Sequence, residues 1–130
     1  MAACSAKSAL AFILTGGNVH DAPAGRDLLD VICSEDNHFC EMDRAYEGDA
    51  TRAKAIESGF IPVVPPKKNR KNPWEYDKEL YKRRNEIERF FLRIKRFRKV
   101  FTRYDKLDTS YTAVVNLAMI FDAVISVNRL

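Results

Sequence analysis

The sequence has few of the residues that mark metal-binding or disulfide-rich proteins. Its 130 residues include three Cys and two His. Cys4, Cys33 and Cys40 do not have the spacing of zinc ligands, and their odd number leaves one thiol over in any disulfide framework. We therefore expect reduced, partly buried thiols in a cytoplasmic protein. His20 and His38 are isolated in the sequence, and we expect each to be structural.

Long hydrophobic runs are also scarce. The apolar run from Ala9 to Leu14 is too brief for a signal peptide followed by a cleavage site. The segment from Tyr111 to Val127 is apolar, but it is shorter than a membrane span and is interrupted by Asn116 and Asp122. The sequence therefore predicts a buried helix in this segment and no membrane partner. It contains no internal repeat and no low-complexity tract.

The positive charge is concentrated in one part of the chain. The formal net charge is +4, and the excess of Lys and Arg lies between Lys67 and Arg103. A concentrated basic block is the footprint expected for contact with phosphate groups. The plain alternative is a basic, solvated surface. The length suits one modest domain, residues 1–130, and not two.

The order of the expected elements predicts an α/β fold, with a mixed sheet flanked by helices. Gly59 is expected to stop the second helix, and Asp21 is expected to cap the first. Pro62 cannot donate to a strand ladder, which favours an edge position for its strand. The expected strands are at about 9–15, 38–42 and 60–64, and the expected helices at about 21–33, 50–58, 78–101 and 109–127.

The segment from Asp77 to Phe101 is the longest without Gly or Pro, and it consists mostly of helix formers. Asp77 is a suitable N-cap, and the early carboxylates suit the positive end of the helix dipole. Apolar residues recur at helical spacing and predict one buried stripe. We therefore expect one continuous helix, with a stripe made of Leu80, Ile87, Phe91, Ile94, Phe97 and Phe101.

A second set of residues on this expected helix has a distinctive spacing. Tyr81, Arg84, Glu88 and Lys95 point within roughly 60° of each other at 100° per residue. The simplest interpretation is a solvated basic helix with pairs such as Arg84 and Glu88. The four types and their three gaps, however, resemble the Y-R-E-K signature of bacterial insertion-sequence transposases of the DDE type. The surrounding residues, YKRRNEIERFFLRIKRFRKVFTRYDKLDTSY, are similar as well.

Asp43 directly follows an expected strand, where open α/β sheets usually bind ligands. On position alone, Asp43 could equally begin a turn. Its context, EMDRAYEGDATRA, resembles that of the family's second catalytic Asp. The resemblance implies that Asp43 and Glu88 are two members of the catalytic triad and bind Mg²⁺ or Mn²⁺. Two such ions about 4 Å apart can activate the attacking oxygen and stabilise the leaving oxygen at a phosphodiester.

The resemblance also implies DNA contacts. Lys95 is expected to meet a phosphate near the transposon end, and Arg84 to hold Glu88 or touch the DNA backbone. Tyr81 is expected to contact DNA or simply to pack. A basic loop is a second candidate, with a solvated surface loop as its alternative. Its Trp could stack on a base or staple the loop to the body. The loop candidates are Lys67, Lys68, Arg70, Lys71 and Trp74.

The chain departs from the family pattern at its start. The family's first catalytic Asp lies on an upstream strand, and Met1 to Lys7, MAACSAK, contains no carboxylate. The resemblance therefore implies a partial RNase H-like fold that lacks the first catalytic strand. We expect a truncated or split DDE catalytic domain that represents its C-terminal part. Whether this chain is an active enzyme stays open.

The implied function is DNA transposition by metal-dependent phosphodiester cleavage and strand transfer at insertion-sequence ends. The alternative is a non-catalytic nucleic-acid-binding remnant that uses the basic helix and loop; a structural interaction protein ranks last. The implied partners are transposon-end and target DNA, further copies of the chain on DNA, and an upstream transposase half. The implied location is the bacterial cytoplasm, at the nucleoid.

Overall fold

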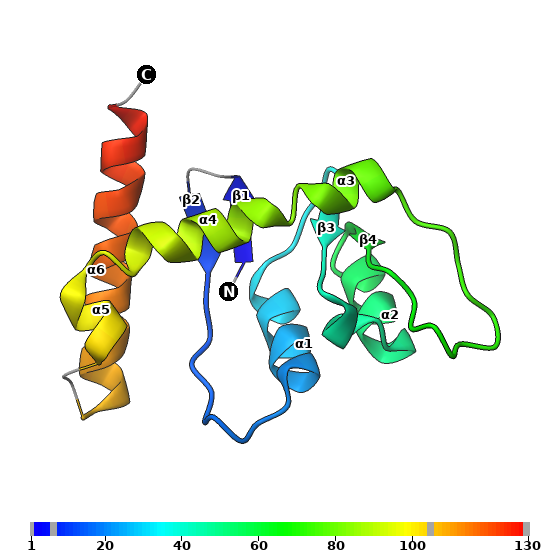
Figure 1. Cartoon of the computed structure of the whole chain (residues 1–130), viewed down its shortest axis with the longest axis horizontal. Helices are drawn as coiled ribbons and strands as arrows, with labels where there is room; N and C mark the ends of the chain where they lie inside the picture. The colour runs from blue at the N-terminus through cyan, green and yellow to red at the C-terminus, as the bar shows by residue number, and fades with distance from the viewer. Residues whose placement is uncertain (1, 6–7, 104–105, 129–130) are drawn as a thin grey trace. The chain divides into compact units, whose positions relative to one another are not determined.

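The computed structural model describes residues 2–5, 8–103 and 106–128 (Figure 1). Tyr104 and Asp105, in the linker expected between the last two helices, lie outside the described residues. The chain divides into two compact units. One is Thr15–Arg84, and the other joins Met1–Leu14 to Asn85–Leu130. Each unit is described by itself below.

The unit Thr15–Arg84 contains a small parallel sheet with helices. Strands β3 and β4 pair in parallel, with His38 opposite Phe60 and Glu41 opposite Val63. The Met42 N–H continues this pairing with a 2.9 Å hydrogen bond to the Val63 carbonyl. The strands expected at 38–42 and 60–64 are thus confirmed. The elements are α1 (Asp21–Val31), β3 (His38–Glu41), η1 (Arg44–Tyr46), α2 (Asp49–Glu57), β4 (Phe60–Val63) and α3 (Lys78–Lys82).

The core of this unit lies between the sheet and its helices. Parallel strands need a crossover connection, and α2 supplies it between β3 and β4. The buried side chains are Leu29, Met42, Ala55 and Val64, and the partly buried ones around them are Ile32, Cys40, Tyr46, Phe60 and Trp74. Burial, with a smaller effect of the Glu41 charge, raises the pKa of Cys40 to about 11. Cys40 is thus a protonated part of the core at neutral pH.

The helix limits in this unit follow local chemistry closely, with one correction. Helix α1 begins at Asp21, but His20 is the N-cap and makes no side-chain capping bond. Asp21 is therefore not the cap, although its charge still suits the positive end of the helix. Helix α2 matches the expected 50–58 within one residue. Gly59 follows it at φ +82°, the left-handed conformation that ends many helices.

The other unit combines a short antiparallel hairpin with helices. Its elements are β1 (Ala2–Ser5), β2 (Ser8–Ala11), α4 (Asn85–Ile94), α5 (Arg98–Thr102) and α6 (Asp108–Val127). The strand expected at 9–15 is wrong at its end, because β2 stops at Ala11. Its partner β1 is four residues long, so the ladder ends there. The hairpin also means that the strands form two separate sheets and not one mixed sheet.

The continuous helix expected at 78–101 is wrong, because the structure has α3, α4 and α5 in its place. After α3, the Arg83 and Arg84 N–H groups bond to carbonyls three residues back, at 2.9 and 3.1 Å. After α4, the Arg96 and Phe97 N–H groups do the same, at 3.2 and 3.1 Å. Such tight turns interrupt the four-residue ladder of an α-helix without any Gly or Pro.

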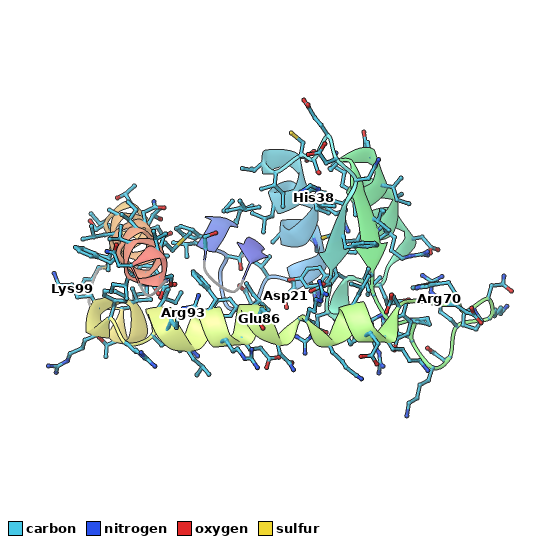
Figure 2. The ribbon with its side chains drawn as sticks, turned by 90° about the horizontal axis from the view of Figure 1, so that it is seen from above. Asp21, His38, Arg70, Glu86, Arg93 and Lys99 are labelled. Carbon is cyan, nitrogen blue, oxygen red and sulfur yellow. The ribbon has the colours of Figure 1, made fainter. Side chains whose placement is uncertain are left out.

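The buried face of α4 also differs from the expected stripe. Phe90 is fully buried and Ile94 is nearly so, whereas Phe91 is 37% exposed. Arg93 lies on α4 (Figure 2). It pairs with Asp122, a buried residue of α6, through Nε at 3.0 and 3.1 Å from the two carboxylate oxygens. This ion pair fixes how α4 and α6 meet.

Helix α6 has the expected limits, but it is not the buried helix that the sequence predicted. Val115 and Ala118 are buried and pack with Val100. Several large apolar side chains of α6 are exposed, namely Leu117, Ile120, Phe121, Val124, Ile125 and Val127. By length and composition α6 could cross a membrane, which for one such helix is weak evidence.

Candidate functional site

Asp43 lies just beyond the carboxyl end of β3 and begins the turn η1. Its Oδ1 accepts a hydrogen bond from the Ala45 N–H at 3.2 Å, and its carbonyl accepts one from the Tyr46 N–H at 2.9 Å. The side chain of Asp43 is 51% exposed. Both sequence interpretations of Asp43 are therefore compatible, since it begins a turn and also presents a carboxylate at a strand end.

Tyr46 anchors the turn that Asp43 begins. Its ring packs so closely on Gly25 of α1 that a Cβ at Gly25 would lie 2.5 Å from the ring. Burial raises the pKa of Tyr46, and the charges of Asp21 and Asp43 raise it further. The backbone after Asp43 is thus held against α1, which limits the directions open to the carboxylate.

Arg84 is the cation beside Asp43. Its Nη1 lies 3.2 Å from Oδ2 of Asp43, and its guanidinium carbon lies 5.7 Å from the centre of the Tyr81 ring. Tyr81 in turn makes an edge-to-face contact with Tyr76, with ring centroids 5.7 Å apart. The structure therefore brings Asp43, Arg84 and Tyr81 together. The sequence had suggested Glu88 as a carboxylate that Arg84 holds, and it gave no indication of the contact with Asp43.

Glu88 and Lys95 belong to the other unit. Glu88 is exposed on α4, and Lys95 is exposed in the turn that follows α4. The Lys95 N–H bonds to the Phe91 carbonyl at 3.0 Å. Because Lys95 retains this helical bond, Glu88 and Lys95, seven residues apart, point to the same side of the helix axis of α4 and the turn that follows it.

The basic loop between β4 and α3 is attached to the unit through Arg70. Arg70 lies in this loop (Figure 2). Its Nε donates to Glu47 Oε2 at 2.7 Å, and its Nη2 lies 2.8 Å from a carboxylate oxygen of Asp49. Glu47 is only 5% exposed, and it also pairs with Lys67 at 3.5 Å. Arg70 and Lys67 therefore neutralise a buried carboxylate, a network that no local sequence signal revealed.

Trp74 is the second anchor of this loop. Its Nε1 donates to the Val64 carbonyl at 2.8 Å. The Arg52 guanidinium lies 3.6 Å from its ring centre and that of Arg70 lies 4.8 Å away, within cation–π range. Trp74 thus attaches the loop to the core, and its ring already contacts the guanidinium groups of Arg52 and Arg70.

Lys68 and Lys71 are exposed loop cations that are not used to neutralise Glu47. Both are exposed, and neither makes an ion pair within residues 2–5, 8–103 and 106–128. Of the five loop candidates, these two therefore have charges that the described part of the loop leaves for phosphate contact, and Lys67 is exposed as well.

Glu47 predicts a specific pH dependence of stability. Its hydrogen bond with Arg70, followed by the Arg70 and Lys67 charges, lowers the pKa of Glu47 from its ordinary 4.5 despite the opposing effect of burial. A lowered pKa stabilises the fold above the unfolded-state value, and this stabilisation is lost as pH falls through the folded-state value. Glu47→Gln should cost about 2 kcal/mol at pH 7.

Urea denaturation of both proteins between pH 7 and pH 3 measures this effect. The difference between wild type and Glu47→Gln should shrink as pH falls below about 4.5. A difference that is constant over this pH range would show that the carboxylate charge is not what stabilises the loop.

The donor chemistry around Asp43 fits a divalent cation in part. An exposed carboxylate oxygen is the hard ligand that Mg²⁺ and Mn²⁺ prefer, and the Arg84 guanidinium shows that a cation is accommodated beside it. In the described parts of the chain, no group of three or more His, Cys, Asp or Glu residues is arranged to hold a metal ion. Asp43 therefore fits as one ligand of a set.

A strand-end carboxylate with nearby cations is an arrangement suited to chemistry on phosphate esters. Residues 1–121 match the family model of the transposase DDE domain. A Brucella ovis protein described as a transposase for the insertion sequence element IS6501 is 33% identical over 106 residues, which are 80% of this chain and 79% of that protein. The chain belongs to the DDE transposase family, which implies a role in transposition. No solved structure matches it.

Proposed function

We propose that this chain carries part of the catalytic centre for DNA transposition, by metal-dependent phosphodiester cleavage and strand transfer at insertion-sequence ends. The observation that carries the proposal is the exposed Asp43 carboxylate at the end of β3, held by the Ala45 N–H. The family match and the Y-R-E-K spacing support Glu88 as a second acidic ligand. An RNase H-like fold is part of this proposal.

In this proposal the residues have separate tasks. Asp43 would be one ligand of a divalent cation, and the family match suggests Glu88 as a further acidic ligand. When bound, the cations would activate the attacking oxygen and stabilise the leaving oxygen. The Ala45 N–H holds the Asp43 carboxylate and the Tyr46 N–H holds the Asp43 backbone carbonyl, so little ordering is required when a cation arrives. Lys95, Lys68 and Lys71, all exposed, offer point charges to DNA phosphates. Tyr81 supports Arg84.

Neutralising the two carboxylates tests the proposal directly. We expect Asp43→Asn and Glu88→Gln each to lower Mg²⁺-dependent nicking of a duplex carrying the insertion-sequence ends by about a hundredfold or more. DNA binding, followed by fluorescence anisotropy, should persist in both variants. Glu79→Gln is the matched control, because Glu79 is an exposed helix carboxylate that pairs with Lys82.

Equal nicking by wild type, Asp43→Asn and Glu88→Gln would disprove the assigned roles. The same holds if Glu79→Gln loses as much activity as the two site variants. We also expect DNA affinity to fall as the salt concentration rises. Each phosphate contact should make the slope of log affinity against log salt more negative by about 0.9.

The exposed cations favour one alternative function, a non-catalytic nucleic-acid binder. Lys68, Lys71 and Lys95 are exposed cations, and binding through them needs neither Asp43 nor Glu88. This alternative predicts salt-sensitive DNA binding, no Mg²⁺-dependent nicking by wild type, and equal or tighter binding by Asp43→Asn because a negative charge is removed.

A further inference from the structure

Arg84 occupies the position beside Asp43 where a cation is needed. The two carboxylate oxygens of Asp43 have different surroundings, because Oδ1 already accepts a hydrogen bond from the Ala45 N–H. Oδ2 is the oxygen that faces the Arg84 guanidinium, at 3.2 Å. The oxygen best available to a metal ion is therefore the one that the guanidinium holds.

The position of Arg84 is set by structure around it. Its backbone N–H closes a tight turn on the Tyr81 carbonyl at 3.1 Å, and its guanidinium lies over the Tyr81 ring. Tyr81 is fixed by its edge contact with Tyr76. The Arg84 side chain is 27% exposed, compared with 51% for Asp43. This pairing is thus more ordered than a contact between two fully solvated side chains.

A divalent cation and a guanidinium do not share one carboxylate oxygen easily. Mg²⁺ requires oxygen ligands at about 2.0–2.1 Å in near-octahedral geometry. Two cations within a few ångströms of one another repel, and at a partly exposed site this repulsion is weakened but not removed by solvent. Entry of the metal ion at Oδ2 therefore requires Arg84 to move away from the carboxylate.

We propose that Arg84 is a positioning residue that holds Asp43 in the metal-free protein and competes with the divalent cation for its carboxylate. This proposal rests on the proposed function, since it takes Asp43 to be a metal ligand. In the metal-free state the guanidinium holds the Asp43 carboxylate through its contact with Oδ2. On metal binding it gives up this contact.

The test is a Mn²⁺ titration of the full chain, with free Mn²⁺ measured by electron paramagnetic resonance. Removing the competitor in Arg84→Gln should tighten Mn²⁺ binding by about three- to fivefold, the range expected for an exposed ion pair. Arg84→Lys keeps the charge and should stay near wild type. Arg83→Gln is the matched control, because it removes the same charge one residue away, near Glu41.

The double variant separates direct competition from a general effect of charge. In the Asp43→Asn background, Arg84→Gln should no longer change Mn²⁺ affinity, since the shared carboxylate is gone. Far-UV circular dichroism of every variant confirms that it is folded. A merely structural role for Arg84 would move the dichroism signal and not the Mn²⁺ affinity.

Two different results would overturn two different claims. If Asp43→Asn leaves Mn²⁺ binding unchanged, the proposed function fails because Asp43 is not a ligand. If Asp43→Asn weakens Mn²⁺ binding while Arg84→Gln and Arg83→Gln tighten it equally, Asp43 is a ligand and only the proposed competition fails. A loss of Mn²⁺ affinity in folded Arg84→Gln would also overturn the competition.

Discussion

Phe90→Ala is expected to lower the free energy of unfolding by about 3–5 kcal/mol, the range for removing a fully buried Phe side chain. Phe90 has no exposed surface, and Arg93 lies over its ring at 5.3 Å. Truncation would leave a cavity and would also remove the ring that the Arg93 guanidinium contacts. The measurement is urea denaturation of the whole chain, followed by far-UV circular dichroism.

Phe91→Ala is the matched control for this prediction. Phe91 is the next residue on α4 and is 37% exposed, so its truncation should cost about 1 kcal/mol or less. The pair also tests the helix register, because the sequence pattern had assigned Phe91 to the buried stripe. A larger loss from Phe91→Ala than from Phe90→Ala would mean that the register described for α4 is incorrect.

Gly59→Ala is the second substitution with a large expected effect, a loss of about 3 kcal/mol. Gly59 has φ +82°, and a Cβ there would collide with the backbone carbonyl of Ser34. A backbone carbonyl cannot change rotamer as a side chain can. Removing this clash therefore requires the segment between α1 and β3 to move. That segment is tied to the end of α2 by the Ser34 N–H bond to the Ser58 carbonyl, at 3.0 Å.

Gly17→Ala provides the control, because no atom lies within 4 Å of a Cβ at Gly17. Its effect should stay within about 1 kcal/mol. Thermal unfolding of both variants measures the difference. A melting temperature that falls equally in the two variants would contradict the role assigned to Gly59.

Features that depend on neighbouring residues were predictable from the sequence. Asp77 does cap α3, where its Oδ1 accepts bonds from the Glu79 and Leu80 N–H groups at 2.9 and 3.0 Å. Gly59 ends α2 as its conformational freedom suggested, and β4 follows its apolar run. Each of these signals acts over a few residues.

Breaks in the long basic segment were not predictable in the same way. Residues around Arg83 and Arg96 are good helix formers, so local propensity favours continuity through both positions. The structure nevertheless tightens there into three-residue hydrogen bonds. Packing overrides propensity at such points, and a single sequence does not reveal that packing. The Ala- and Ser-rich strand β1 was missed for a related reason, since it lacks β-branched residues.

Pairs between distant residues could not be predicted from the sequence at all. The spacing pattern correctly drew attention to Asp43 and Arg84, but nothing in it indicated that they contact each other. Arg70 and Trp74 were expected to contact DNA. In the structure they also attach their loop to the protein, through Glu47 and the Val64 carbonyl. Such contacts depend on which elements pack together, and periodicity describes one element at a time.

The unequal environments of two cysteines have a practical consequence. Cys33 is exposed, whereas Cys40 lies in the core with its pKa raised to about 11. Since the thiolate is the reactive form, a maleimide fluorophore at neutral pH should attach to Cys33 and spare Cys40. With Cys4 replaced by Ser, one dye would then sit just after α1. Its fluorescence anisotropy would report DNA association with Asp43, Arg84 and the loop cations all left unsubstituted.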